Sequence, residues 1–149
     1  MTDYRVMNNA NASFRVGLNE TAVGVIIPRS IHEHFSHIVG PRQADLMALS
    51  GAMVSPEEAL KVGLVDELAS SADEATARCI AKVESVLSGV VFEAFSESKK
   101  AIKQRRADLL LQDAADETWI DHFFSEPIQK ALRATIVGMK RKKTTETKA

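Results

Sequence analysis

Cysteine is nearly absent from the sequence, which holds only Cys79 among its 149 residues. One cysteine cannot form a disulfide within the chain, so the class of small domains stabilised by disulfides is excluded. Long apolar runs are missing too, and no stretch approaches the roughly 20 consecutive apolar residues that a membrane-spanning helix requires. The sequence therefore predicts a chain with no membrane span, whose core depends on side-chain packing.

An excess of charge of one sign is also lacking. The 19 Lys and Arg residues are balanced by 20 Asp and Glu residues, which gives a formal net charge of -1. No global electrostatic attraction toward nucleic acid is expected from this balance. A local basic run, residues 140–143, is typical of a solvated helix end, where cations suit the negative end of the helix dipole.

Several motifs that carry chemistry are absent as well. The sequence has no Gly-rich phosphate loop, no Cys-x-x-Cys pair and no Gly-x-Ser-x-Gly nucleophile elbow. His32, His34 and His37 have a spacing that suits one helix, but no cysteine or well-placed carboxylate supplies a third metal ligand. An exposed polar face accounts for them better, and the sequence predicts no metal site.

The N-terminal part of the sequence has the patterns of short strands. Residues 4–7 and 14–18 alternate between apolar and polar side chains, and an apolar run over 23–27 ends at Pro28. We expect the strands at 4–7 and 14–18 to pair or to lie side by side. A sheet this small is not self-sufficient. The sequence therefore predicts exposed apolar faces near Tyr4, Val6, Val16 and Val25.

Helical patterns fill the rest of the sequence. Ser55, Pro56 and Glu58 form a strong helix start, with a serine cap, a proline at the first helical position and a glutamate for a capping box. Ser30 is the expected cap of an earlier helix. Helices are predicted over 30–37, 42–49, 73–87, 91–106, 109–124 and 126–140, besides the short one that begins near residue 56.

One segment points to a known family. Residues 17–28, which begin Gly17-Leu18-Asn19-Glu20, resemble the Leu-Asn-Glu segment of mitochondrial enoyl-CoA delta-isomerases in the crotonase superfamily. The resemblance continues through Gly40-Pro41-Arg42-Gln43-Ala44, Leu49-Ser50-Gly51, residues 57–66 and residues 124–132. Almost the whole chain is covered. The Leu-Asn-Glu context favours the isomerases, because hydratases of the superfamily usually carry Pro-Glu at that place.

The resemblance implies an α/β fold of the crotonase type that is mostly helical in this chain. It would contain the last β-β-α turn of the crotonase spiral, followed by a C-terminal helical oligomerisation region. The expected divisions are the C-terminal part of the crotonase core at 1–68, a helical trimerisation region at 69–143 and a disordered tail at 144–149.

By the same resemblance, the chain is an enoyl-CoA delta-isomerase that moves the double bond of a 3-enoyl-CoA to the 2-trans position in the β-oxidation of unsaturated fatty acids. Glu20 occupies the position of the catalytic carboxylate. The reaction removes a proton from C2 and returns one at C4, and one carboxylate placed over both carbons can do both. The implied substrate-binding residues are Leu18, Asn19, Val25 and Phe124.

Further expectations follow from the family alone. The substrate is a fatty acyl-CoA, no cofactor is needed because coenzyme A is part of that substrate, and the partner is a second copy of the chain in a homo-oligomer, a trimer. The implied location is the mitochondrial matrix. The two backbone N–H groups that hold the enolate come from the N-terminal half of the family's fold, which precedes the residues matched here, so the chain is expected to be truncated.

Three interpretations remain open from the sequence. The chain is either an isomerase, whole or truncated, or a catalytically inactive crotonase-like module that pairs with a full-length subunit. A fragment of an enoyl-CoA hydratase is the other possibility, because the residues that would separate the two activities lie in the earlier half.

Trp119, Phe123 and Phe124 form a helical aromatic stripe that suits a core or subunit interface, or else the wall of an acyl pocket.

Overall fold

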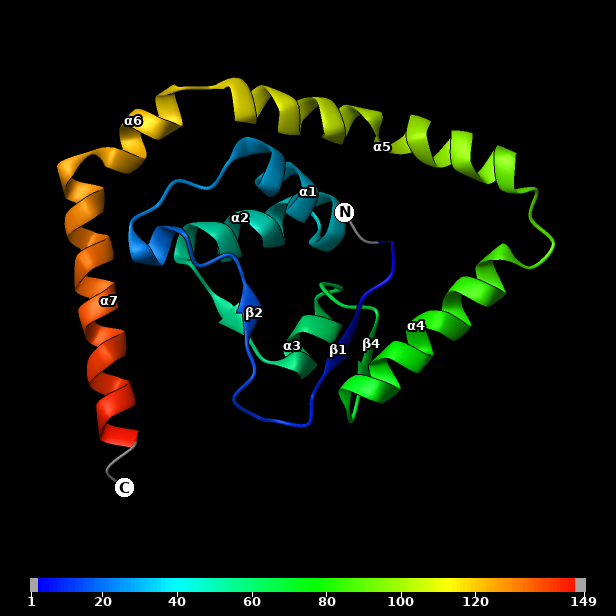
Figure 1. Cartoon of the computed structure of the whole chain (residues 1–149), viewed down its shortest axis with the longest axis horizontal. Coiled ribbons are helices and arrows are strands. Elements are labelled where there is room, and N and C mark those ends of the chain that lie inside the picture. Colours follow the sequence, from blue (N-terminus) through cyan, green and yellow to red (C-terminus); the bar gives the residue numbers. More distant parts are fainter. Residues whose placement is uncertain (1–2, 147–149) are drawn as a thin grey trace.

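The computed structural model describes the backbone of residues 3–146 and the side chains of residues 3–138. A small body of short strands and helices lies at the centre, and later helices pass around three sides of it (Figure 1). The body contains β1 (Val6–Asn8), β2 (Val16–Gly17), the 3-10 helix η1 (Thr21–Val23), α1 (Arg29–Val39), α2 (Pro41–Ser50), β3 (Met53–Val54), α3 (Pro56–Lys61) and β4 (Glu67–Ala69). The surrounding helices are α4 (Ala72–Leu87), α5 (Phe92–Ala115), α6 (Thr118–Phe124) and α7 (Glu126–Glu146).

The strands form two separate pairs. β1 runs parallel to β4, with Val6 opposite Glu67, and β2 runs antiparallel to β3, with Val16 opposite Val54. The prediction that the first two strands pair or lie side by side is wrong, because each finds its partner much later in the chain. A parallel pair needs a long crossover, and residues 9–66 supply one for β1 and β4.

The helix starts show both a confirmed and a mistaken prediction. Ser55 caps α3 as expected: the Glu58 N–H donates to Ser55 Oγ over 3.2 Å, and the Ser55 N–H donates to Glu58 Oε2 over 3.0 Å. Ser30 does not cap α1, which begins at Arg29. Instead, the backbone N–H of Ser30 donates to Asp113 Oδ2 over 2.6 Å, so a carboxylate from α5 satisfies a free donor at the start of α1.

The later helices differ in extent from the predicted ones. α5 continues through residues 107–108, where a break was expected, and ends at Ala115. The real break lies at Asp116, whose Oδ1 accepts from the Thr118 N–H over 2.9 Å at the start of α6. α7 extends to Glu146 and so includes residues 144–146 of the predicted tail, whereas 147–149 lie outside the described residues.

The buried core lies within the central body. Its members come from α1, α2, α3 and the residues after α3: Phe35, Ala44, Met47, Ala59, Leu64 and Val65. None of Tyr4, Val6, Val16 and Val25 is fully buried, as predicted. Many large apolar side chains on the surrounding helices are exposed, including Ile80, Val83, Phe92, Ile102 and Leu111. Nowhere in the described part of the chain is a helix long and apolar enough to cross a membrane.

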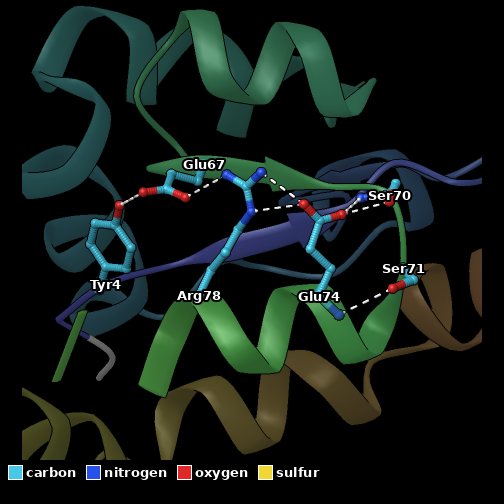
Figure 2. A network of polar contacts seen from close by, with 6 residues as sticks. All are labelled: Tyr4, Glu67, Ser70, Ser71, Glu74 and Arg78. Atoms are coloured by element: carbon cyan, nitrogen blue, oxygen red, sulfur yellow. Dashed lines mark hydrogen bonds and ion pairs between the residues drawn. The ribbon is translucent and has the colours of Figure 1, made fainter. Parts of the chain in front are cut away.

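A polar network joins α4 to the β1–β4 pair (Figure 2). Arg78 of α4 pairs with Glu67 of β4 through Nη1 at 2.8 Å and with Glu74 through Nη2 at 2.8 Å. Glu67 in turn accepts from the Tyr4 hydroxyl, just before β1. This hydrogen bond raises the pKa of Tyr4 to about 12 and, together with Arg78, lowers the pKa of Glu67.

Candidate active site

Glu20 lies at the entry of a single 3-10 turn. Its backbone has helical dihedral angles, and its carbonyl accepts from the N–H of Val23 at 3.1 Å and of Val25 at 2.8 Å. Gly24 ends the turn with a φ of 84°, in the left-handed region that glycine adopts without a steric cost. The backbone that carries Glu20 is therefore held by its own hydrogen bonds.

Contacts with two helices hold this turn in place. The Thr21 hydroxyl donates to the backbone carbonyl of Ala48 in α2. On the other side, a Cβ atom added to Gly24 would lie 2.8 Å from the Cβ of Ala131 in α7. The turn thus lies against both α2 and α7, and glycine at position 24 allows the close approach of α7.

The side chain of Glu20 is half-buried, and one of its oxygens has an unusual environment. Oε2 is buried and has no hydrogen-bond partner among the described residues. Burying a polar atom without a partner costs free energy, so such atoms need an explanation in a folded protein. The unpartnered oxygen makes Glu20 a candidate proton acceptor.

A cavity of about 560 Å³ lies beside the turn. Thr21, Gly24 and Val25 line it from the turn, and Ala48 and Leu49 line it from α2. The remaining lining residues are Ile26, Ile27, His32, Asp45 and His122. Its size and its mostly apolar wall suit a small-molecule site.

Four of the five residues that the sequence singled out are neighbours in the chain, and of these Val25 alone is among the residues that line the cavity. Leu18, Asn19, Glu20 and Val25 belong to one short segment: Leu18 packs against the core, Asn19 is exposed and Val25 lines the cavity. Phe124 lies apart from them. It lines a different cavity of about 400 Å³ between α6 and α7, and it is 69% exposed.

Three polar residues of the cavity were missed from the sequence. His32 Nε2 lies 2.9 Å from Asp45 Oδ1, and His122 reaches the same cavity from α6. His32 was interpreted only as part of an exposed histidine face. No sequence signal links these positions, because they lie on three different helices. Within the described residues, no group of three or more His, Cys, Asp or Glu side chains could hold a metal ion.

The other histidines of α1 have different surroundings. The Nδ1 atom of His34 is buried without a hydrogen-bond partner among the described residues. Burial, together with the nearby positive charge of Arg106, lowers the pKa of His34 below its usual value. The predicted exposed face therefore does not include His34, whereas His37 is exposed.

Comparison with known proteins identifies the family. The model of the enoyl-CoA hydratase/isomerase family matches residues 1–142, nearly the whole chain. The chain belongs to the enoyl-CoA hydratase/isomerase family. The crotonase superfamily predicted from the segment around Glu20 is thereby confirmed.

Mitochondrial isomerases are among the relatives of this family member. The chain is 32% identical over 146 residues to "Enoyl-CoA delta isomerase 1, mitochondrial" of Rattus norvegicus, with 95% of this chain and 48% of the rat protein covered. The human protein of that name is 25% identical over 143 residues, with coverage of 95% and 46%. The chain therefore spans about half the length of the curated relatives it matches.

Solved structures confirm the fold. The crystal structure of human mitochondrial delta3-delta2-enoyl-CoA isomerase matches with a TM-score of 0.85 at 25% identity, over 95% of this chain and 54% of that one. An enoyl-CoA hydratase from Bacillus halodurans matches with a TM-score of 0.67 at 24% identity, over 89% and 52%. The predicted crotonase-type fold, mostly helical in this part of the family's architecture, is confirmed.

Proposed function

We propose that this chain carries the catalytic base of an enoyl-CoA delta-isomerase, which moves the double bond of a 3-enoyl-CoA to the 2-trans position. The observation that carries the proposal is the buried, unpartnered Oε2 of Glu20, in a segment whose following residues Thr21, Gly24 and Val25 line an apolar cavity. The Leu-Asn-Glu sequence context and the names of the curated relatives support the choice of isomerisation.

The proposed reaction needs one proton acceptor that later returns the proton. Glu20 removes a proton from C2 of the acyl thioester, and the electron pair of that C–H bond delocalises toward the thioester oxygen as an enolate. The protonated Glu20 then delivers the proton to C4, which leaves the double bond between C2 and C3. No electron is gained or lost overall, so the reaction requires no redox cofactor, and coenzyme A belongs to the substrate.

The enolate oxygen needs hydrogen-bond donors that the Glu20 segment does not supply. Two backbone N–H groups aimed at such an oxygen can each contribute about 3 kcal/mol to stabilising the transition state. We assign these donors to the half of the family's fold that this chain does not span. The proposed enzyme is therefore complete only when that half is present, in the same polypeptide or in another.

The acyl chain is assigned to the cavity beside the turn. Val25, Ile27 and Leu49 offer apolar contacts there, and Leu18 and Asn19 flank the base. Phe124 lines a separate cavity, so the proposed acyl wall rests on Val25 rather than on Phe124.

We further propose a homo-oligomer, a trimer, located in the mitochondrial matrix and acting in fatty-acid β-oxidation. The exposed apolar side chains of α4 and α5 support self-association, because surfaces of this kind mark interaction sites. The location rests on the names of the curated relatives, all of which are mitochondrial.

Isomerase activity on a 3-enoyl-CoA tests the proposal. The chain is assayed alone and together with the N-terminal half of the rat relative, each beside Glu20→Gln and the control Glu84→Gln, an exposed position on α4. We expect activity in the combined sample, a loss of at least a hundredfold in Glu20→Gln and little change in Glu84→Gln. A folded, combined sample in which Glu20→Gln retains full activity would refute the assignment of the base.

The exposed apolar helices also support a second candidate, an inactive module that pairs with a full-length subunit. This candidate predicts a stable complex with the full-length rat protein and no isomerase activity that depends on Glu20. Hydration of a 2-enoyl-CoA, measured in the same samples, separates both candidates from a hydratase fragment.

A further inference from the structure

Helix α6 contributes His122 to the wall of the cavity beside the Glu20 turn. In Figure 1, α6 lies above the loop that connects η1 to α1, and this loop supplies Ile26 and Ile27 to the cavity wall. A second cavity of about 440 Å³ shares Ile26, Ile27 and His32 with the first and reaches Trp119 of α6. Trp119 and His122 are three residues apart and so lie on one face of α6, which points toward this loop.

The polar atoms along this cavity are mainly hydrogen-bond acceptors. Asp45 is a carboxylate and can only accept, so the 2.9 Å contact requires His32 Nε2 to carry the hydrogen. The Thr21 hydroxyl gives its hydrogen to the Ala48 carbonyl, which leaves only lone pairs toward the cavity.

These acceptors favour one kind of group on a bound chain. A carbonyl or ether oxygen cannot donate and would leave the acceptors unpaired, at a cost in binding. An anionic group would meet the charge of Asp45 in this cavity. A hydroxyl is neutral and donates one hydrogen, so it pairs with an acceptor without bringing a charge into an apolar cavity.

We propose that this cavity takes an acyl chain that carries a hydroxyl group, and that the His32–Asp45 pair, with His122 beside it, recognises the hydroxyl. The assignment of an acyl chain rests on the proposed function. The pair is within reach of a ligand, because the His32 and Asp45 side chains are 38% and 59% exposed. The cavity would therefore bind an acyl chain with a hydroxyl group more tightly than a chain of equal length without one.

Three pantetheine thioesters test this specificity in direct binding to the full chain. They are decanoyl-pantetheine and two derivatives with a hydroxyl or an oxo group on the penultimate carbon. The hydroxyl and oxo groups are similar in size, and only the hydroxyl donates. We expect calorimetric titration to show threefold to tenfold tighter binding of the hydroxy chain than of the oxo chain.

Variants of the cavity separate the hydroxyl contact from apolar packing. Asp45→Leu should bring the ratio of the two dissociation constants close to one, and His122→Leu should reduce it. Leu49→Ala is the matched control, because it removes only apolar contact and should weaken all three chains by a similar factor. Equal binding of the hydroxy and oxo chains by the unaltered protein, or a preference that survives both Asp45→Leu and His122→Leu, would overturn the proposal.

The same titrations distinguish this inference from the proposed reaction. Glu20→Gln should abolish isomerase activity but keep the hydroxyl preference. A preference that depends on Asp45 supports the recognition site even if no isomerisation is found. Failure of all three thioesters to bind overturns the site, whereas the role of Glu20 is still decided by the isomerase assay with the complementing half.

Discussion

At the scale of single residues, Gly24 controls how closely α7 approaches the turn that carries Glu20. Its φ of 84° disfavours any residue with a Cβ atom, and an added Cβ would lie 2.8 Å from that of Ala131. Gly89 has a similar φ of 74°, but nothing lies within 4 Å of its added Cβ. The two glycines therefore separate backbone strain from packing against α7.

The first prediction concerns this pair. Gly24→Ala should lower the free energy of unfolding by about 2–3 kcal/mol, and Gly89→Ala by only about 1 kcal/mol, the cost of left-handed backbone. Urea unfolding monitored by circular dichroism measures both. Adding Ala131→Gly to Gly24→Ala should recover part of the extra stability that Gly24→Ala loses relative to Gly89→Ala. An equal loss of stability in the two single variants would show that the contact with α7 does not contribute to it.

His34 supplies a second prediction, on pH. Its pKa is lowered in the folded chain, chiefly by burial and then by Arg106, so the unfolded chain binds the proton more tightly. The stabilisation given by neutral His34 is thus fully present above the ordinary histidine pKa of about 6.5, and is lost as the pH falls through the lower, folded-state value.

Unfolding measured between pH 7.5 and pH 5 should show this loss, and a His34→Gln variant should lose less stability than the unaltered chain over the same range. The exposed His37 serves as the control, and His37→Gln should keep the full pH dependence. Identical pH profiles for all three proteins would exclude a contribution from His34.

At the scale of elements, the start of α1 depends on a helix far away in the sequence. Asp113 of α5 accepts from the Ser30 N–H, where the capping side chain was expected to come from within α1 itself. A sequence pattern can detect a capping residue only when it lies within a few residues of the helix start. The cap at Ser55 was therefore predicted, whereas the one at Asp113 was not. Only the packing of α5 across α1 brings this carboxylate to the helix start.

The third prediction follows from that contact. Asp113→Ala should cost about 1 kcal/mol of stability, as the loss of a helix cap usually does. Hydrogen exchange should quicken at the first amides of α1 and leave those of α3 unchanged. Asp108→Ala is the control, since Asp108 is exposed and, within the described part of the chain, accepts only from Gln104 of the same helix. Equal exchange in the two variants would contradict the capping role.

The network around Arg78 in Figure 2 supports a fourth prediction, on α4. Arg78→Met keeps most of the side-chain length but removes the pairing with Glu67 and Glu74. Amides in the first turns of α4 should then exchange faster. The effect should persist below the pH at which ordinary glutamates are protonated and fade only in stronger acid, because the lowered pKa values of Glu67 and Glu74 keep these carboxylates charged until then. Exchange that is unchanged at neutral pH would show that the pairing does not hold α4.

At the scale of the whole molecule, the helices outside the central body expose many large apolar side chains. Phe92 and Ile102 of α5 are 64% and 68% exposed. The short strand pairs also have open edges, because β1 and β4 pair with each other and β2 with β3. A chain of this kind is expected to bury these surfaces against other polypeptide.

The fifth prediction is that the purified chain self-associates. Light scattering coupled to size-exclusion chromatography should give a mass that is a multiple of 16.3 kDa. Phe92→Glu combined with Ile102→Glu should lower that mass, because charges at these places oppose burial. The exposed polar pair Glu97→Gln and Lys100→Gln on the same helix should leave the mass unchanged. A monomeric unaltered chain would refute self-association.

The sequence alone was enough to determine the family, the mostly helical character and the capping box at Ser55, because each depends on residues close together in the chain. The pairing of β1 with β4 and of β2 with β3, the capping of α1 by Asp113 and the cavity shared by Val25, His32, Asp45 and His122 were decided only by the tertiary structure. Each of these joins segments separated by long loops or whole helices. Their meeting depends on how the helices pack, and no local pattern records that packing.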